Sequence, residues 1–242
     1  MTALSFNYGC GYAGCIETVA IDCLMVRLFN AISEDNVGWL QAATDKLRTA
    51  FASNLIDIVP SYTTVMVHFD LMSIDIQQAR QMILSALHDL ELSADAGGNL
   101  HCIPVWYDPS VGPDLITLAE RSGLDQEEII RRHCAKVYRV FALGFTPGFA
   151  FMGLVEPALA APRLATPRQR IIAGSVGIGE RQTAIYPSES PGGWNVIGRT
   201  PVLLFSEGQS LLAPGDSVSF EAIDRGRFIE LGGNLAPLEG KP

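Results

Sequence analysis

The residues best suited to chemistry concentrate in one segment of this chain, residues 157–206. Five arginines fall there against two glutamates, so the segment carries a net charge of +3 in a chain of net charge −9. Arginine holds a carboxylate or phosphate with two parallel N–H donors, so this segment indicates an anionic ligand. The alternative is that these arginines are solvated or brace turns through backbone carbonyls. The five are Arg163, Arg168, Arg170, Arg181 and Arg199.

Three other polar residues could orient or act on such a ligand. Gln182 and Tyr186 are four residues apart, so in a regular strand their side chains face the same side and can bind a small polar molecule. A cross-strand packing pair explains them equally well. His133 lies near the end of an arginine-rich helical segment. It is either an acid–base residue, with an ordinary pKa of ~6.5, or a cap of that helix, and the cap is favoured.

Two glycine-rich stretches surround these residues. GFTPGFAF (144–151) places three phenylalanines around a tight Gly-Pro loop, which either forms the lip of a pocket or, as we favour, closes a barrel as a buried aromatic turn. GSVGIG (174–179) lacks the lysine and the strand–turn–helix setting of nucleotide-binding loops, and its glycines are more typical of bulges in a bent strand. The sequence shows no G-x-S-x-G elbow and no Ser-His-Asp order.

Composition narrows the class of protein. The 242 residues are 48% hydrophobic and 18% charged, which is enough for a sizeable core in one large or two modest domains. The acidic balance argues against nucleic-acid binding. No apolar run reaches the ~18–20 residues of a membrane span, and the N-terminus lacks a signal-peptide pattern, so we expect a cytoplasmic protein. Five dispersed cysteines, Cys10 among them, and four scattered histidines predict neither a disulfide framework nor a metal site.

The first half alternates strands and helices. An apolar run at 19–29 predicts a strand, and apolar residues at helical spacing predict a helix over 37–51. Strands follow at 55–59 and 63–69, then a second helix from Ile76 to Leu90, which the polar stretch around Gly97 and Gly98 ends. A last strand at 100–107 completes the order β-α-β-β-α-β, a ferredoxin-like domain over residues 1–107.

The second half begins differently and then changes character. Two helices are predicted after the turn cluster at 108–114, one that Asp114 or Pro113 opens and that runs to Gly123, and one capped by Asp125. Beyond Tyr138, short apolar runs separated by Gly and Pro predict a compact β-barrel or sandwich. The chain is therefore predicted to be α+β, with a second domain over residues 108–242.

Several motifs of the second half occur together in one known family. They are YDPSVGPDL, LDQEEIIRRH, GFTPGFAFMG, PRLATPRQRIIAGSVGIGERQTAIYP, SPGGWNVIGRTP and LLAPGDSV. In this order they resemble the B subunit of the bacterial ATP-dependent 5-oxoprolinases, a family that includes allophanate hydrolase subunit 1 and the Kip inhibitors. The resemblance is close over residues 105–220. Glu180-Arg181 stands where the family usually has two small residues.

The resemblance implies a fold and an activity. The implied fold is a ferredoxin-like domain followed by a cyclophilin-like β-barrel. The implied activity is the opening of 5-oxoproline to glutamate with ATP and Mg, in a complex with the A and C subunits of 5-oxoprolinase. The chain has no Walker-type loop and is expected to hydrolyse little ATP alone. One branch of the family instead inhibits a sensor histidine kinase, and another reading is a carboxyltransferase component acting on urea or a related amide.

The family motifs also imply site residues. His133, Arg168, Gln182 and Tyr186 are the expected catalytic group. An accompanying substrate- or anion-binding group is expected at a pocket shared with the C subunit, and no metal ligand is expected. This second group consists of Phe149, Arg163, Arg170, Ser175 and Arg199.

Overall fold

The computed structural model describes residues 4–8, 11–92 and 98–238 of an α+β chain. The chain divides into two compact units, Met1–Gly97 and Gly98–Pro242. The predicted boundary after residue 107 differs from this division, because the strand at 100–105 belongs to the second unit. Cys10 and Gly97 lie outside the described residues.

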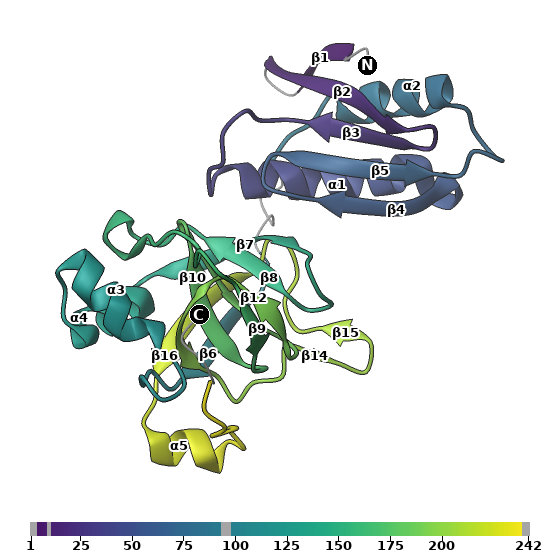
Figure 1. Ribbon diagram of the computed structural model, residues 1–242. Helices are drawn as coiled ribbons and strands as arrows, with labels where there is room; N and C mark the ends of the chain where they lie inside the picture. The colour runs from purple at the N-terminus through teal and green to yellow at the C-terminus, as the bar shows by residue number, and fades with distance from the viewer. Residues whose placement is uncertain (1–3, 9–10, 93–97, 239–242) are drawn as a thin grey trace. The chain divides into compact units, whose positions relative to one another are not determined.

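The first unit is an antiparallel sheet with two helices packed on it (Figure 1). The helices are α1 (Asn36–Phe51), which a short 3₁₀ turn at Ala52–Asn54 follows, and α2 (Ile76–Leu87). Both place apolar residues against the strands in one core, as their helical spacing predicted. In sheet order the strands are β1 (Leu4–Tyr8), β2 (Tyr12–Ala20), β3 (Cys23–Arg27), β5 (Thr64–Phe69) and β4 (Leu55–Pro60).

The start of α2 shows how local sequence sets an element. The carboxylate of Asp75 accepts hydrogen bonds from the backbone N–H groups of Gln77 and Gln78, and the Gln78 side chain accepts one from the Asp75 N–H. This capping box satisfies N–H groups that the first turn of a helix leaves unpaired. The helix ends at Leu87, three residues before the predicted end at Leu90.

The N-terminal region departs most from the prediction. The run at 19–29 is not one strand: it turns at Ile21-Asp22 between β2 and β3, and the glycine-rich lead-in itself pairs as β1 and β2. Buried Tyr8 and Ile16 anchor this lead-in to the core. Beside β3, in the place expected for the strand at 100–107, lies β2. The elements from β3 onward follow the predicted β-α-β-β-α-β order along the chain, but the last strand, at 100–105, lies in the second unit. The first unit alone therefore does not complete a ferredoxin-like domain.

The second unit is built on a seven-stranded sheet with its own core. The two helices predicted before the barrel are present, and they lie between the first two strands of this sheet in the chain. These helices are α3 (Asp114–Ser122) and α4 (Gln126–Ala135), and α5 (Arg225–Glu230) follows the last strand. In sheet order the strands are β13 (Asn195–Arg199), β10 (Ser175–Gly179), β11 (Gln182–Ile185), β8 (Ala150–Gly153), β7 (Val137–Leu143), β16 (Ser217–Ala222) and β6 (Leu100–Val105). Small pairs are β9 (Arg168–Ile171) with β12 (Ser190–Gly192) and β14 (Phe205–Ser206) with β15 (Gln209–Ser210), and a 3₁₀ turn covers Pro157–Leu159.

A single bridge brings the two edges of this sheet together. Just beyond β6, Trp106 exchanges both backbone hydrogen bonds with Arg199 at the end of β13, at 2.8 and 2.9 Å. The sheet is therefore nearly closed and barrel-like (Figure 1), which is consistent with the predicted cyclophilin-like barrel. Inside it lies an apolar core that includes Tyr138, Val176 and Phe220.

A buried ion pair joins the helical part of this unit to its strands. Asp114, the first residue of α3, accepts two hydrogen bonds from the guanidinium of Arg168 at 2.7 and 2.8 Å and a third from the backbone N–H of Val196 at 2.7 Å. Both charged side chains are at most 9% exposed. One carboxylate thus holds α3, β9 and β13 together.

Replacing Asp114 by alanine should destabilise the protein by about 3–5 kcal/mol, because Arg168 would keep a buried, unpaired charge. Urea unfolding measures this loss. In a double-mutant cycle, Asp114→Ala combined with Arg168→Met should cost clearly less than the two single losses together. Additive losses would contradict the pairing.

Candidate functional site

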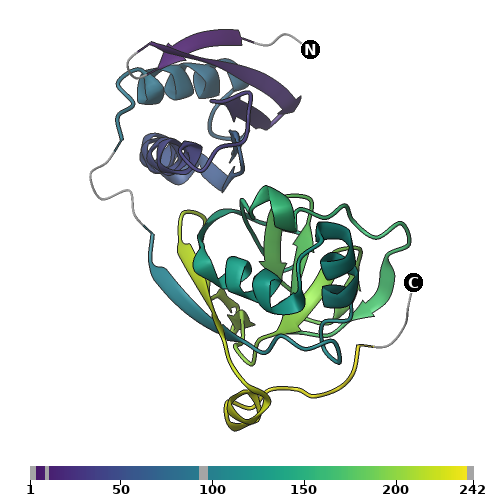
Figure 2. The same ribbon diagram turned by 90° about the vertical axis from the view of Figure 1, so that its left-hand side faces the viewer.

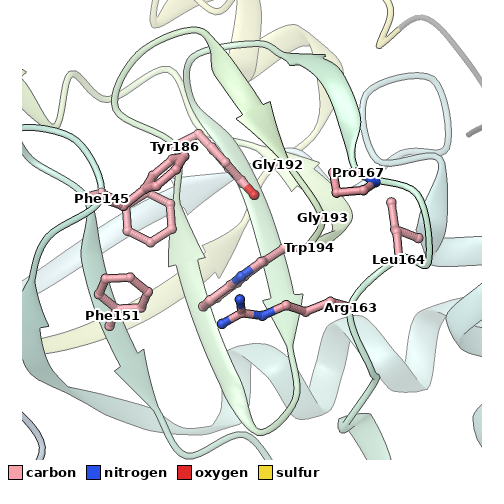
Figure 3. Close-up of a pocket in the computed structure, with 10 residues that line it drawn as sticks. Phe145, Phe151, Arg163, Leu164, Pro167, Tyr186, Gly192, Gly193 and Trp194 are labelled. Atoms are coloured by element: carbon pink, nitrogen blue, oxygen red, sulfur yellow. The ribbon is translucent and has the colours of Figure 1, made fainter.

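A cavity of about 230 Å³ lies on the second unit, with aromatic walls and one arginine among its lining residues (Figure 3). Its walls come from the loop between β7 and β8, the segment before β9, and the turn between β12 and β13. A mostly apolar concave site with few polar groups is the usual form of a small-molecule pocket. The lining residues are Phe145, Phe149, Phe151, Arg163, Leu164, Pro167, Tyr186, Gly192, Gly193 and Trp194.

The GFTPGFAF stretch forms one wall. Its loop closes through hydrogen bonds from Gly144 N–H to the Phe149 carbonyl and from Phe149 N–H to the Thr146 carbonyl. Gly148 has φ +84°, and a Cβ there would lie 2.7 Å from Phe205, so only glycine fits. The loop buries Phe149, as expected of a buried aromatic turn, and leaves 60% of Phe145 exposed at the rim, as expected of a pocket lip. Each of the two interpretations of this motif is therefore partly correct.

Trp194 forms the floor, and the glycines of β10 make room for it. A Cβ on Gly179 would lie 2.7 Å from the indole ring, so the ring lies directly on the strand backbone. The pairing of β10 with β13 also shifts register between Val176 and Gly177, but the extra residue, Ile197, lies in β13 and not in the GSVGIG strand for which a bulge was predicted. The β10 glycines therefore accommodate an aromatic ring.

Tyr186 reaches the cavity from the end of β11 (Figure 3). Burial raises the pKa of its hydroxyl to about 12, although the backbone of Trp194 and the charges of Arg163 and Arg168 oppose that shift. The hydroxyl is therefore protonated at neutral pH. It can donate a hydrogen bond to a ligand but does not serve as a phenolate base.

Arg163 supplies the positive charge of the cavity. Its guanidinium carbon lies 5.9 Å from the centroid of the Trp194 ring, within the range of a cation–π contact (Figure 3). Such a position holds the guanidinium against the aromatic floor and leaves its N–H donors for a ligand. The cavity can therefore hold a small, flat anion.

The other four arginines of the positive segment lie outside the cavity lining. Arg168 is paired with Asp114, and Arg170 lies on the surface 2.9 Å from Glu189. Arg181 donates to the Val155 carbonyl at 3.3 Å, and Arg199 is buried and donates to two carbonyls. Arg181 and Arg199 therefore brace the backbone through its carbonyls, which is the alternative role that the sequence left open. Glu180-Arg181 forms the two-residue turn between β10 and β11.

His133 is buried in the second unit, also apart from the cavity lining. Tyr107 O–H donates to its Nδ1 at 2.7 Å, and its Nε2 lies 3.0 Å from the Thr183 hydroxyl, which itself donates to the Gly177 carbonyl. This network assigns the proton of the neutral ring to Nε2. Burial lowers the pKa of His133 to about 3, so the ring is neutral at pH 7. It cross-links α4 to the barrel.

The two remaining predicted residues lie on β10 and β11. Ser175 is fully buried opposite Arg199, and Gln182 is half-buried opposite Gly153 and Gly179. Alternation along β11 places Gln182 and Tyr186 on the same side, as predicted, yet Tyr186 alone of the two lines the cavity. Of the nine predicted site residues, the cavity brings together Phe149, Arg163 and Tyr186.

Two important residues were missing from the predicted site. Trp194 was not predicted, although the Pro-Gly-Gly that precedes it (191–193) is a sequence signal for a close approach of the backbone. Asp114, the partner of Arg168, lies 54 residues earlier in the chain and was read only as the start of a helix. Pairing across that distance depends on the fold, so no local pattern indicates it.

Two kinds of feature are absent from the described residues. In the part of the chain that the structure describes, no group of three or more His, Cys, Asp or Glu side chains could hold a metal ion. Among the same residues, no helix combines the length and the apolar character needed to cross a membrane.

The fold and the cavity define an α+β protein whose barrel-like second unit carries an aromatic, arginine-containing pocket. Residues 15–213 match the family model described as carboxyltransferase domain, subdomain C and D, and the chain belongs to this family. It is 34% identical over 221 residues to the Bacillus subtilis (strain 168) protein named as the B subunit of 5-oxoprolinase, covering 86% of this chain and 92% of that one. The resemblance inferred from the motifs is thereby confirmed.

Solved structures agree with this placement. The protein TTHA0988 superposes with a TM-score of 0.73 at 35% identity, over 84% of this chain, and the chain spans only 40% of that protein. The urea carboxylase of Kluyveromyces lactis superposes with a TM-score of 0.73 over 95% of this chain and 23% of its own. At 15% identity, that second likeness shows the fold alone.

Replacing Gly179 by alanine should disturb the cavity floor, because the added methyl group would meet the Trp194 ring. Overpacking of this kind costs about 1–3 kcal/mol. We expect a lower melting temperature together with a changed tryptophan emission. Gly144→Ala is the matched control, since its Cβ would meet nothing closer than 3.6 Å. If the two variants had the same melting temperature and the same tryptophan emission, the Trp194 ring would not require a glycine at position 179.

The pH dependence of stability should report on His133. The unfolded chain takes up a proton near pH ~6.5, but the folded ring does so only near pH 3. The contribution of the neutral ring is therefore complete above pH 6.5 and is lost as pH falls toward 3. In urea titrations, the stability difference between wild type and His133→Gln should shrink over this window. A difference that stays constant with pH would contradict the neutral, buried state.

Proposed function

We propose that this chain is the B subunit of an ATP-dependent 5-oxoprolinase, which opens 5-oxo-L-proline to L-glutamate together with the A and C subunits in the cytoplasm. Relatives that carry the name of this subunit support the proposal. The observation that carries it is the position of Arg163 over Trp194 in an aromatic cavity of about 230 Å³.

The substrate matches this cavity in shape and charge. 5-Oxoproline is a small, nearly flat lactam ring bearing one carboxylate. Its ring can lie on the aromatic walls while Arg163 holds the carboxylate with two N–H donors. Tyr186, which stays protonated at neutral pH, can then donate a hydrogen bond to a ligand oxygen. The chain thus binds, orients and partly desolvates the lactam.

Two features of the described residues favour assigning the nucleotide to another subunit. The glycines of β10 lie in a strand that is hydrogen-bonded on both sides, to β11 and β13, so their N–H groups form a sheet and not a phosphate cradle. The cavity is also small for a nucleoside triphosphate. We therefore assign ATP and its Mg to the rest of the complex, and this chain to substrate binding.

The other readings have weaker support. A urea carboxylase-like role rests on likeness of fold, which does not determine the reaction. A chain of that kind would use urea and a biotin-bearing partner. A kinase inhibitor would bind a sensor histidine kinase without the C subunit. Co-purification with the kinase would therefore favour the inhibitor, and co-purification with the C subunit would favour the 5-oxoprolinase subunit.

In a complex reconstituted from the A, B and C subunits, Arg163→Met should raise KM for 5-oxoproline roughly tenfold or more, because a charge-assisted hydrogen bond is lost. ATP-dependent release of glutamate is the measurement. Arg131→Met, which removes an exposed arginine of α4, is the matched control and should leave KM unchanged.

Two results would count against the proposal. An unchanged KM in Arg163→Met would remove this arginine from the substrate site. Full turnover of 5-oxoproline and ATP by the purified chain, without its partners, would contradict the division of labour between the subunits.

A further inference from the structure

Arg199 is a buried cation with no acidic partner among the described residues. Its side chain is fully buried, and burial lowers its pKa to about 10, which leaves it charged at pH 7. Its Nη1 donates to the carbonyls of Asn234 and Ala236, at 2.7 and 2.6 Å. Neutral carbonyls alone are weak compensation for a buried charge, which is normally paired with an acidic group.

The remaining donors of this guanidinium lie along one edge. Nε and Nη2 are both buried and have no hydrogen-bond partner within the described part of the chain. Together they present two parallel N–H groups, the fork that matches the two oxygens of a carboxylate. Directly opposite on β10, the hydroxyl of Ser175 is likewise buried and unpartnered. Nε and Nη2 of Arg199 and the hydroxyl oxygen of Ser175 are thus three buried polar atoms without hydrogen-bond partners, and they come from two residues that face each other across the strands.

These atoms lie on the same face of the sheet as the aromatic cavity. Residues 175, 177 and 179 of β10 share one face of the strand. On that face Gly177 lies against Trp194 and Tyr186, and Gly179 lies against Trp194. Opposite residues of an antiparallel pair point to the same face, so Arg199 joins Ser175 there. The polar group therefore lies on the glycine side of β10, outside the barrel core.

A short segment at the end of the described chain contacts the Arg199 guanidinium through two backbone carbonyls. We name residues 234–238 the strap. It follows α5 without helix or strand structure (Figure 2). Four of its five residues are exposed, and Leu238 is buried in the cluster that contains Phe149, Tyr186 and Trp194. Among the described residues, the strap is held by the buried Leu238 side chain and by two carbonyls that accept hydrogen bonds from Arg199.

We infer that Arg199 and Ser175 form a second binding site, for the carboxylate of a small organic acid, and that the strap closes it. In the closed form, the strap carbonyls occupy one end of the guanidinium. When the strap leaves, the Nε–Nη2 edge takes both carboxylate oxygens and Ser175 donates a third hydrogen bond. The site is separate from the Arg163 cavity and goes beyond the proposed function, because it does not depend on which amide is the substrate.

The test opens the strap in the full-length chain by Leu238→Ala, in an Arg163→Met background that disables the cavity. Calorimetric titration with L-glutamate should show saturable binding, about tenfold or more tighter than in Arg163→Met alone. Adding Arg199→Lys should abolish binding, since lysine keeps the charge but lacks the fork. If that variant fails to fold, Ser175→Ala should instead weaken binding several-fold.

Hydrogen exchange of the Arg199 guanidinium N–H groups, followed by NMR, verifies that the strap has opened, because the strap carbonyls accept hydrogen bonds from its Nη1. Faster exchange without any gain in glutamate binding would overturn the inference and leave Arg199 as a clamp for the chain end. Inorganic phosphate binding as tightly as glutamate would overturn the carboxylate assignment. Neither result bears on the KM effect expected for Arg163, so the two proposals fail independently.

Discussion

The second unit depends on one buried carboxylate. Asp114 accepts hydrogen bonds from the Arg168 side chain and the Val196 backbone, and each of these partners adjoins a wall of the cavity. Arg168 follows Pro167, and Val196 lies two residues after Trp194. Because a buried charge tolerates little departure from its partners, this interaction fixes the distance between the two walls. The cavity is therefore positioned by a helix terminus that does not line it.

Local sequence patterns predicted the helices and strands well, but they predicted poorly which strands pair and which side chains contact each other. Both helices of the first unit and the two helices before most of the barrel strands followed from periodicity and caps, whereas the bulge predicted for the glycine-rich strand lies in its partner β13. The strand at 100–105 was recognised but assigned to the wrong sheet, since a short apolar run does not specify its partner. The five arginines looked alike in sequence, yet their roles differ because burial and partners come from segments far apart. Only Arg163 has its charge at the cavity.

Strand β10 separates two environments. Val176 and Ile178 point into the barrel core, where apolar packing closes the sheet. The alternate positions, Ser175, Gly177 and Gly179, present small residues to the other face, where aromatic rings and a guanidinium can approach the backbone. The alternation of side chains along a strand thus lets five residues serve both stability and recognition. This division explains why a glycine-rich motif without any nucleotide-binding geometry occurs in the chain.

The parallel pairing of β6 with β16 carries a consequence for how the protein is made. Leu100 lies opposite Ser217, so the ribosome must synthesise more than a hundred residues after β6 before its partner exists. The first unit, whose strands pair within Met1–Gly97, can fold while this synthesis continues. Until then β6 remains an unpaired edge, and closure of the barrel becomes a late, slow event with high contact order. Biogenesis of the second unit is thus timed by the emergence of its final strand.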